Sequence, residues 1–305
     1  MSTFAIYTYT FGRIIRSSYN PPYSDRSEEE WAKRLETFRQ FFRKDAPLEE
    51  RKIENGKSTY LYDIVFIGDN IVIMKFSRLL KVVVTDAQLN DQTIEDYPWC
   101  YVVWDNRDGI QRMLVEQKPT VWPNTKFSTG TKRVANALQS ILDDWLVRNA
   151  GMHFFLGDGP VYKTKDFWDW LKHYPQGFSR LRVTIPSPNL GRLMTLGDNM
   201  NELRNETGGG VDIELKASQG GVLKLVPENH QTQSLINLSS AYGSEIKAYP
   251  KDSRTMVKLS GDNIDNDVFV EIPNEVLTRL ASESSFETID FKRLVKILSD
   301  VKNLY

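Results

Sequence analysis

An α+β fold with mainly antiparallel strands, divided into two units, is what the sequence predicts. Short runs that alternate between apolar and polar residues, bounded by turn residues, indicate many strands, and longer runs with apolar residues three and four positions apart indicate fewer helices. The chain has 305 residues, of which 40% are hydrophobic, and this is enough for two cores of ordinary size. We expect an N-terminal α+β unit over 1–176 and a C-terminal ferredoxin-like unit over 177–305.

The N-terminal unit is expected to combine a sheet with helices. A helix is expected over 28–43, because Ser27 precedes three glutamates that favour a helix start and apolar residues then recur at helical spacing. Another helix is expected to begin after Thr131, which would cap it, and to stop at 149–151, where Asn and Gly favour termination. The expected strands are 4–11, 60–67, 71–76, 81–85, 99–104, 110–116 and 153–156, and a third helix is expected over 166–174.

The C-terminal unit shows the order β-α-β-β-α-β, which is that of the ferredoxin-like arrangement. Gly220 and Gly221 would supply its central hairpin. Because this fold hosts many unrelated functions, the order predicts a topology and no activity. The expected strands are 181–185, 211–216, 222–226 and 245–249, the expected helices are 190–204 and 231–242, and a strand at 268–272 and a helix at 290–302 follow.

Composition excludes several classes of protein. Lys and Arg number 39 against 40 Asp and Glu, so the chain as a whole has no strongly charged coat. Cys100 is the single cysteine, and with three scattered histidines it offers no internal disulfide and no zinc set. No apolar run approaches the ~20 residues of a membrane span, and residues 1–15 do not resemble a signal peptide. We expect a cytoplasmic protein that does not insert into a membrane.

A tight antiparallel hairpin is predicted around residue 108, where an Asp-Gly pair accepts positive φ angles. With the chain turning there, Lys118 would lie across from Tyr97 on the neighbouring strand. Asp96, Glu116 and Lys118 would then share one end of the sheet.

These three residues resemble the acidic and lysine residues of the PD-(D/E)xK nuclease superfamily. In that superfamily two carboxylates hold a magnesium ion and the lysine helps to position or activate the attacking water. The resemblance implies a magnesium-dependent nuclease with Asp96, Glu116 and Lys118 as its catalytic residues. Pro119 after the lysine, and Glu95 where a proline usually precedes the aspartate, depart from the family pattern. Solvated charges at a strand end are the simpler interpretation, and under it the chain needs no cofactor.

Positive charge is concentrated in two segments that contain no acid, 117–142 and 170–197. Such segregation can create a surface suited to phosphates although the total charge is near zero. Lys132 and Arg133 would occupy the first turn of the predicted helix, where cations are unfavourable unless an anion binds. The residues expected to contact phosphates are Lys126, Lys132, Arg133, Arg180, Arg182 and Arg192.

The favoured hypothesis is therefore a nucleic-acid-binding protein that contacts backbone phosphates and reads little base sequence. DNA and RNA both remain open. Two other hypotheses stand beside it: the magnesium-dependent nuclease, and a scaffold for protein interactions that would need none of these charged residues.

The layout of the chain resembles bacterial phage-defence proteins of the RexA and Kiwa B-component kind. The resemblance lies in the N-terminal strand Phe-Ala-Ile-Tyr-Thr-Tyr-Thr, the antiparallel strands over 60–76, the strand before Lys118, the helix from Lys132 and the Ser-Pro-Asn at 187–189. It covers most of the chain and carries no specific motif. It implies a cytoplasmic homodimer that binds DNA, senses infection and works with a partner protein. A membrane protein is one candidate for this partner.

Overall fold

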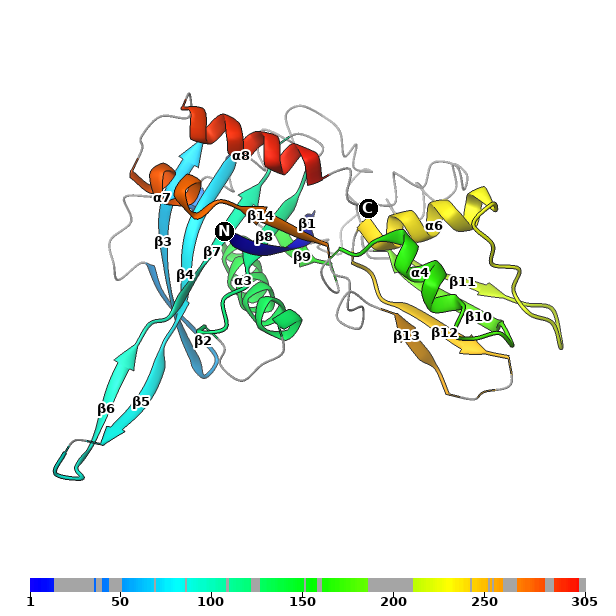
Figure 1. Cartoon of the computed structure of the whole chain (residues 1–305), viewed down its shortest axis with the longest axis horizontal. Coiled ribbons are helices and arrows are strands. Elements are labelled where there is room, and N and C mark those ends of the chain that lie inside the picture. The colour runs from blue at the N-terminus through cyan, green and yellow to red at the C-terminus, as the bar shows by residue number, and fades with distance from the viewer. Residues whose placement is uncertain are drawn as a thin grey trace.

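The structure, a computed structural model, forms a larger and a smaller lobe, each around its own sheet (Figure 1). The expected mixture of helices and mainly antiparallel strands is confirmed. The structure describes residues 1–13, 36, 40–43, 51–68, 70–85, 87–107, 110–121, 127–150, 152–157, 161–185, 211–241, 243–251, 253, 255–259, 268–282 and 288–301.

Within these residues the larger lobe is built on an antiparallel sheet of eight strands. β1 (Ser2–Arg13) is second in the strand order: its first half pairs with the edge strand β14 (Phe269–Ile272) and with β8 (Arg112–Glu116), and its second half pairs with β9 (Met152–Leu156). From β8 the sheet continues through β7 (Trp99–Asp105), β4 (Ile71–Arg78), β3 (Ser58–Gly68) and β2 (Lys52–Asn55).

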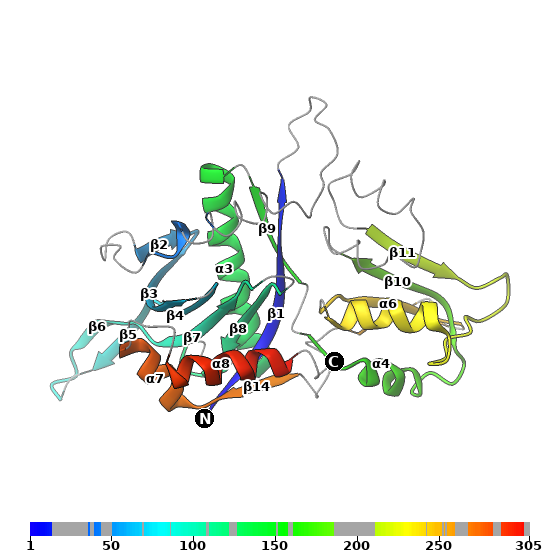
Figure 2. The same ribbon diagram turned by 90° about the horizontal axis from the view of Figure 1, so that it is seen from above.

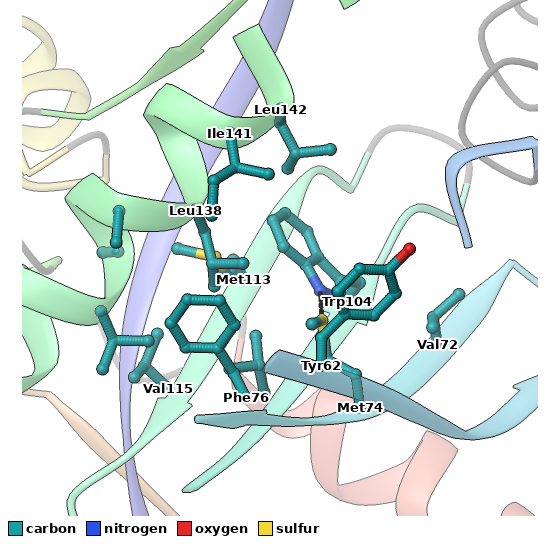
Figure 3. Close-up of a cluster of buried hydrophobic side chains, with 14 of the residues drawn as sticks. Tyr62, Val72, Met74, Phe76, Trp104, Met113, Val115, Leu138, Ile141 and Leu142 are labelled. Atoms are coloured by element: carbon teal, nitrogen blue, oxygen red, sulfur yellow. Dashed lines mark hydrogen bonds between the residues drawn. The ribbon is translucent and has the colours of Figure 1, made fainter. Parts of the chain in front are cut away.

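Both faces of this sheet are covered by helices, on opposite sides (Figure 2). Because successive residues of a strand point to opposite faces, Met74 of β4 enters the core under α3 (Phe127–Ala150), and Ile73 enters the core under α7 (Asn274–Ser282) and α8 (Ile289–Asp300). The core under α3 is drawn in Figure 3, with Tyr62, Val72, Met74, Phe76, Trp104, Met113 and Val115 from the sheet meeting Leu138, Ile141 and Leu142.

Helix α3 begins earlier than expected. It starts at Phe127, so Thr131 lies inside the helix and is 2% exposed. The hydroxyls of Thr131 and Tyr7 share a 2.9 Å hydrogen bond, which ties the helix to β1. The prediction that Thr131 caps this helix is wrong, and Lys132 and Arg133 lie in its second turn rather than its first.

β5 (Leu80–Thr85) and β6 (Asp91–Asp96) form a separate two-stranded ribbon, which we call the arm. The arm projects away from the body of the larger lobe (Figure 1). The strand expected at 81–85 is present, but in the described residues it pairs with β6 instead of joining the larger sheet. In the described residues, no helix packs against either face of the arm.

The smaller lobe has a four-stranded antiparallel sheet in the order β11-β10-β12-β13, as far as the structure describes the chain. Its core contains Phe167, Leu181, Val183, Ile236 and Ile246, which come from two helices and from the inner face of the sheet. The strands are β10 (Phe178–Ile185), β11 (Val211–Lys216), β12 (Ile246–Pro250) and β13 (Val257–Leu259), and the helices are α4 (Thr164–Leu171) and α6 (His230–Ala241).

The ferredoxin-like order is not confirmed in this lobe. In the ferredoxin-like arrangement the first two strands are parallel and another strand lies between them. Here the corresponding strands, β10 and β11, are direct antiparallel neighbours. Residues 222–226 form no strand; the backbone N–H of Leu223 donates a 2.7 Å hydrogen bond to the Phe178 carbonyl, and Leu223 packs against the core. The helix expected at 190–204 lies outside the described residues.

The chain path also divides the molecule differently from the expected boundary near 176 and 177. The described residues between 162 and 259 form the smaller lobe, and the chain then returns to the larger sheet, where Ile272 pairs with Ser2. α7 and α8 complete the core that contains Phe4 and Ile6 of β1. The smaller lobe is thus inserted in the chain between β9 and β14 of the larger sheet.

Two expectations about helices concern the remaining segments. The helix expected over 28–43 falls mostly outside the described residues, although Glu36, Gln40 and Phe41 are helical. In the part of the chain that the structure describes, no helix has both the length and the apolar character needed to cross a membrane.

Candidate nucleic-acid interface

The outer face of the smaller sheet is charged because its strands alternate between core and solvent. On β10, Leu181 and Val183 are buried, whereas Arg180 and Arg182, which alternate with them, have side chains that are 45% and 46% exposed. The same alternation places Lys247 and Tyr249 of β12 on the outer side. We call this surface the basic face; its described members are Arg180, Arg182, Thr184, Asp212, Glu214, Lys216, Glu245, Lys247, Tyr249 and Lys258.

The strand register brings the cations of the basic face into rows across the sheet. Arg180 lies opposite both Lys216 of β11 and Tyr249 of β12. Lys247 lies opposite Arg182 on one side and Lys258 of β13 on the other. Among the described members, five cations therefore stand against the three acids Asp212, Glu214 and Glu245, which leaves an excess of two positive charges.

Two of the three acids of the basic face, Glu214 and Glu245, are each shared between two cations. Glu214 lies 3.3 Å from the guanidinium of Arg180 and 2.8 Å from the ammonium of Lys216. Glu245 lies 3.2 Å from each of Lys247 and Lys258. Because these pairs are solvent-exposed and each acid is divided between two partners, phosphate oxygens can compete for the cations at small cost.

Arg182 and Asp212 form the closest pair on this face. The hydrogen bond from Arg182, followed by a 2.5 Å bond from the Thr184 hydroxyl, lowers the pKa of Asp212 below its usual value. The hydrogen bond from Lys216 likewise lowers the pKa of Glu214. Both carboxylates are thus charged at neutral pH, and each forms an ion pair with an arginine of β10.

One aromatic ring lies among these charges. The guanidinium carbon of Arg180 lies 5.0 Å from the centre of the Tyr249 ring, within the range of a cation–π contact. An aromatic side chain beside cations on an open sheet is the combination that single-stranded nucleic acids use, with bases stacked on the ring and phosphates against the cations. The basic face can therefore take both parts of a nucleotide.

The structure places the predicted phosphate contacts in two separate elements. Arg180 and Arg182 lie on the basic face, whereas Lys132 and Arg133 lie on α3 of the larger lobe, with Arg133 exposed. Lys126 and Arg192 lie outside the described residues. Because α3 starts at Phe127, Lys132 and Arg133 lie beyond its first turn, and, contrary to expectation, the helix start does not disfavour these two cations.

Sequence reasoning missed most of the basic face, including three of its five cations. Lys216, Lys247, Tyr249 and Lys258 lie outside the two acid-free segments, and Lys216 and Lys247 each follow a glutamate by two residues, so a search for acid-free segments cannot find them. The signal that could have found them is the period of two in Val-Asp-Ile-Glu-Leu-Lys and Glu-Ile-Lys-Ala-Tyr, which puts every polar side chain on one face.

The residues of the predicted nuclease site have different partners. Val102 pairs with Val115, and this register aligns Lys118 with Trp99 rather than with Tyr97, so the predicted hairpin register is wrong by two residues. The Lys118 ammonium lies 3.6 Å from the centre of the Trp99 ring. Asp96 pairs with Leu80 where the arm joins the sheet.

Glu116 is held in a hydrogen-bond network and is 9% exposed. One carboxylate oxygen accepts a 2.5 Å bond from the Ser2 hydroxyl, and the other accepts a 2.8 Å bond from the Tyr101 backbone N–H. The Ser2 hydroxyl also lies 2.7 Å from the side-chain oxygen of Asn274, at the start of α7. These hydrogen bonds link β1, β7 and β8 to α7, so Glu116 has a structural role here.

Metal and thiol chemistry find little support among the described residues. In them no group of three or more His, Cys, Asp or Glu side chains is arranged to hold a metal ion. Cys100 is 1% exposed, and burial, together with the nearby charge of Glu116, raises the pKa of its thiol far above the usual range. The thiol packs in the core under α3.

Comparison of the chain with protein-family models, curated proteins and solved structures found no match. The fold and the basic face are therefore the observations from which a function can be argued.

Proposed function

We propose that this protein binds nucleic acid through backbone phosphates on the basic face of the smaller sheet, and that it reads little base sequence. The observation that carries the proposal is the row of cations set by the register of β10 with its neighbours, in which Arg180 and Arg182 lie between Lys216 and Lys247. Cations at strand spacing on an exposed sheet match a repeating chain of phosphates.

The chemistry of the face favours a single strand over a duplex. Tyr249 is partly exposed beside Arg180, and a base can stack on an aromatic ring only when it is unpaired and unstacked, as in a single strand. No described side chain of the basic face lies on a helix that could enter a major groove. We therefore assign single-stranded DNA or RNA as the preferred ligand.

The resemblance in layout to phage-defence proteins of the RexA and Kiwa B-component kind supplies a setting for this activity. In that setting the protein acts in the cytoplasm as a sensor or effector of anti-phage defence, together with a partner protein. Nucleic acid exposed during infection is then the signal that the basic face receives.

The experiment is a binding titration with fluorescently labelled single-stranded and duplex oligonucleotides, read by anisotropy. We expect binding by the wild-type protein, with the single strand bound more tightly. The double variant Arg180→Gln with Arg182→Gln should weaken binding by about tenfold or more, since each lost phosphate contact on an exposed surface costs on the order of 1 kcal/mol.

A matched control changes the same charge elsewhere. Lys292 and Lys296 are exposed on one side of α8, in the larger lobe, so Lys292→Gln with Lys296→Gln removes two cations without touching the basic face. Equal losses in the two double variants would show that only overall charge matters, and they would refute the assignment of the basic face. Running the same samples with magnesium and then EDTA on a gel tests the nuclease hypothesis, which requires cleavage that Glu116→Ala abolishes.

A further inference from the structure

The arm exposes apolar side chains on a ribbon that nothing described covers. Val82, Val83, Val84 and Ile94 are between 43% and 61% exposed. A two-stranded ribbon by itself is marginally stable in water, whereas three or more strands that share an apolar face are stable. The arm is thus an unfinished sheet.

The two edges of the arm differ in charge. The free edge of β6 carries Asp91, Glu95 and Asp96 and no cation, which is how proteins prevent a further strand from pairing. The free edge of β5 has the sequence Leu-Lys-Val-Val-Val-Thr, with three consecutive valines that favour a strand and a single charge. Only the β5 edge is suited to accept another strand.

We infer that the β5 edge pairs antiparallel with the β5 edge of a second copy of this chain, so that the two arms form one four-stranded sheet across a twofold axis. A twofold axis normal to the sheet keeps each side chain on its own face, so residues that pair across it must have the same parity. With Val83 on the axis, Val82 meets Val84 of the partner subunit and Lys81 meets Thr85 of the partner subunit.

Charge complementarity selects a second copy as the occupant. Within one arm, Lys81 lies opposite Glu95, and Thr85 lies opposite Asp91. The Thr85 hydroxyl donates a 2.6 Å hydrogen bond to the Asp91 carboxylate. The joined sheet therefore has rows in the order Glu95, Lys81, then Thr85 and Asp91 of the partner subunit. Each row places one cation between acids, and no like charges face each other across the new ladder.

The apolar side chains agree with the same register. On the other face of the ribbon, Ile94 lies opposite Val82 within the arm. Pairing places Val84 of the partner subunit next to Val82. By symmetry, Val84 lies next to Val82 of the partner subunit, and the two apolar rows are neighbours on the same face. Self-pairing through β6 would instead collect six acids at one junction, which is electrostatically unfavourable.

The inference is tested by sedimentation velocity on the full chain over a concentration series. We expect a reversible dimer for the wild-type protein, and Val83→Lys should raise its dissociation constant by about tenfold or more, because two lysines would meet on the axis. Thr93→Lys is the matched control: Thr93 lies opposite Val83 on the same face but on β6, and the dimer should be retained.

Disulfide trapping reads the register directly. Val83→Cys places two thiols opposite each other across the axis, within the Cα separation that a disulfide spans, and oxidation should convert most of the dimer to a covalent form. In the Thr93→Cys variant the thiols lie three strand spacings apart, about 14 Å, and should remain unlinked. Cys100 is buried and leaves the background low. A monomer at all concentrations, a dimer unaffected by Val83→Lys, or equal trapping in both cysteine variants would overturn the inference.

Discussion

Arg180 on β10 lies directly opposite Tyr249 on β12, and its guanidinium carbon lies 5.0 Å from the centre of the tyrosine ring. The pair joins a cation and an aromatic face at the middle of an exposed sheet. Around this pair the acids are fewer than the cations, so the described surface keeps an excess of positive charge.

Removing an acid from the basic face should strengthen binding, the opposite of removing a cation. In Asp212→Asn the closest partner of Arg182 loses its charge, and the excess of positive charge on the face rises from two to three. We expect affinity for a labelled single strand to rise by about threefold to tenfold at low salt, as expected for one exposed charge. Anisotropy titrations at two salt concentrations measure it, and weaker binding would contradict the competition between Asp212 and phosphate.

Tyr249 should discriminate between single and double strands. Replacing it by Leu removes the ring and should cost about 1–3 kcal/mol of single-strand binding, the usual value of a stacked base, with little effect on a duplex. Tyr249→Phe keeps the ring and serves as the control, which should bind nearly as well as the wild type. If Leu and Phe behave alike, the ring does not stack on a base.

Cys100 should resist modification until the protein unfolds. Burial raises the pKa of its thiol, with the charge of Glu116 adding to the effect, so the folded protein holds a neutral thiol where an unfolded chain, with a pKa near 8.5, holds a thiolate. This raised pKa contributes stability that is fully present below about pH 8.5, and the free energy of unfolding should fall by up to about 1.4 kcal/mol per pH unit above it.

Labelling with a thiol reagent at about pH 9, with and without denaturant, measures the reactivity of Cys100, and denaturant titrations across that pH range measure the stability. Fast labelling of the native protein would show that the thiol is accessible. The valine variant Cys100→Val removes the titrating group, and the stability above pH 8.5 should then depend less on pH.

Local patterns were enough to predict most strands of the larger sheet, although not β2, and they did not predict how the strands are arranged. The strands at 60–67 and 71–76 were correctly expected, and the positive φ of Asn70 explains why the turn between them takes Asn. The pairing of Ser2 with Ile272 joins residues at opposite ends of the chain and leaves no local signal. For this reason the return of 268–301 to the larger lobe was not foreseen.

Tertiary contacts account for two further errors. Thr131 has a residue type that favours a helix start, but α3 begins at Phe127 and the Thr131 hydroxyl bonds to Tyr7 of β1. Residues 222–226 alternate as a strand does, yet Leu223 and Leu225 alternate because they pack against the core of the smaller lobe. Alternation reports which side chains are buried, and a strand is only one way to bury them.

Only two of the five cations of the basic face were predicted from the sequence. Arg180 and Arg182 were found because they lie in a segment without acids, whereas Lys247 lies two residues after Glu245 and cancels in any local sum of charge. Asp96, Glu116 and Lys118 were grouped by an assumed turn, and the observed register assigns Lys118 to Trp99.

The salt dependence of binding is the most direct test of the central claim that phosphates are held by the basic face. A plot of log affinity for a single strand against log salt concentration should be linear, with a slope of about −0.7 for each neutralised phosphate. The account predicts that Arg180→Gln with Arg182→Gln makes this slope shallower by about 1.4, while Lys292→Gln with Lys296→Gln leaves it unchanged. A slope that is identical in all three proteins, or an affinity independent of salt, would contradict the account.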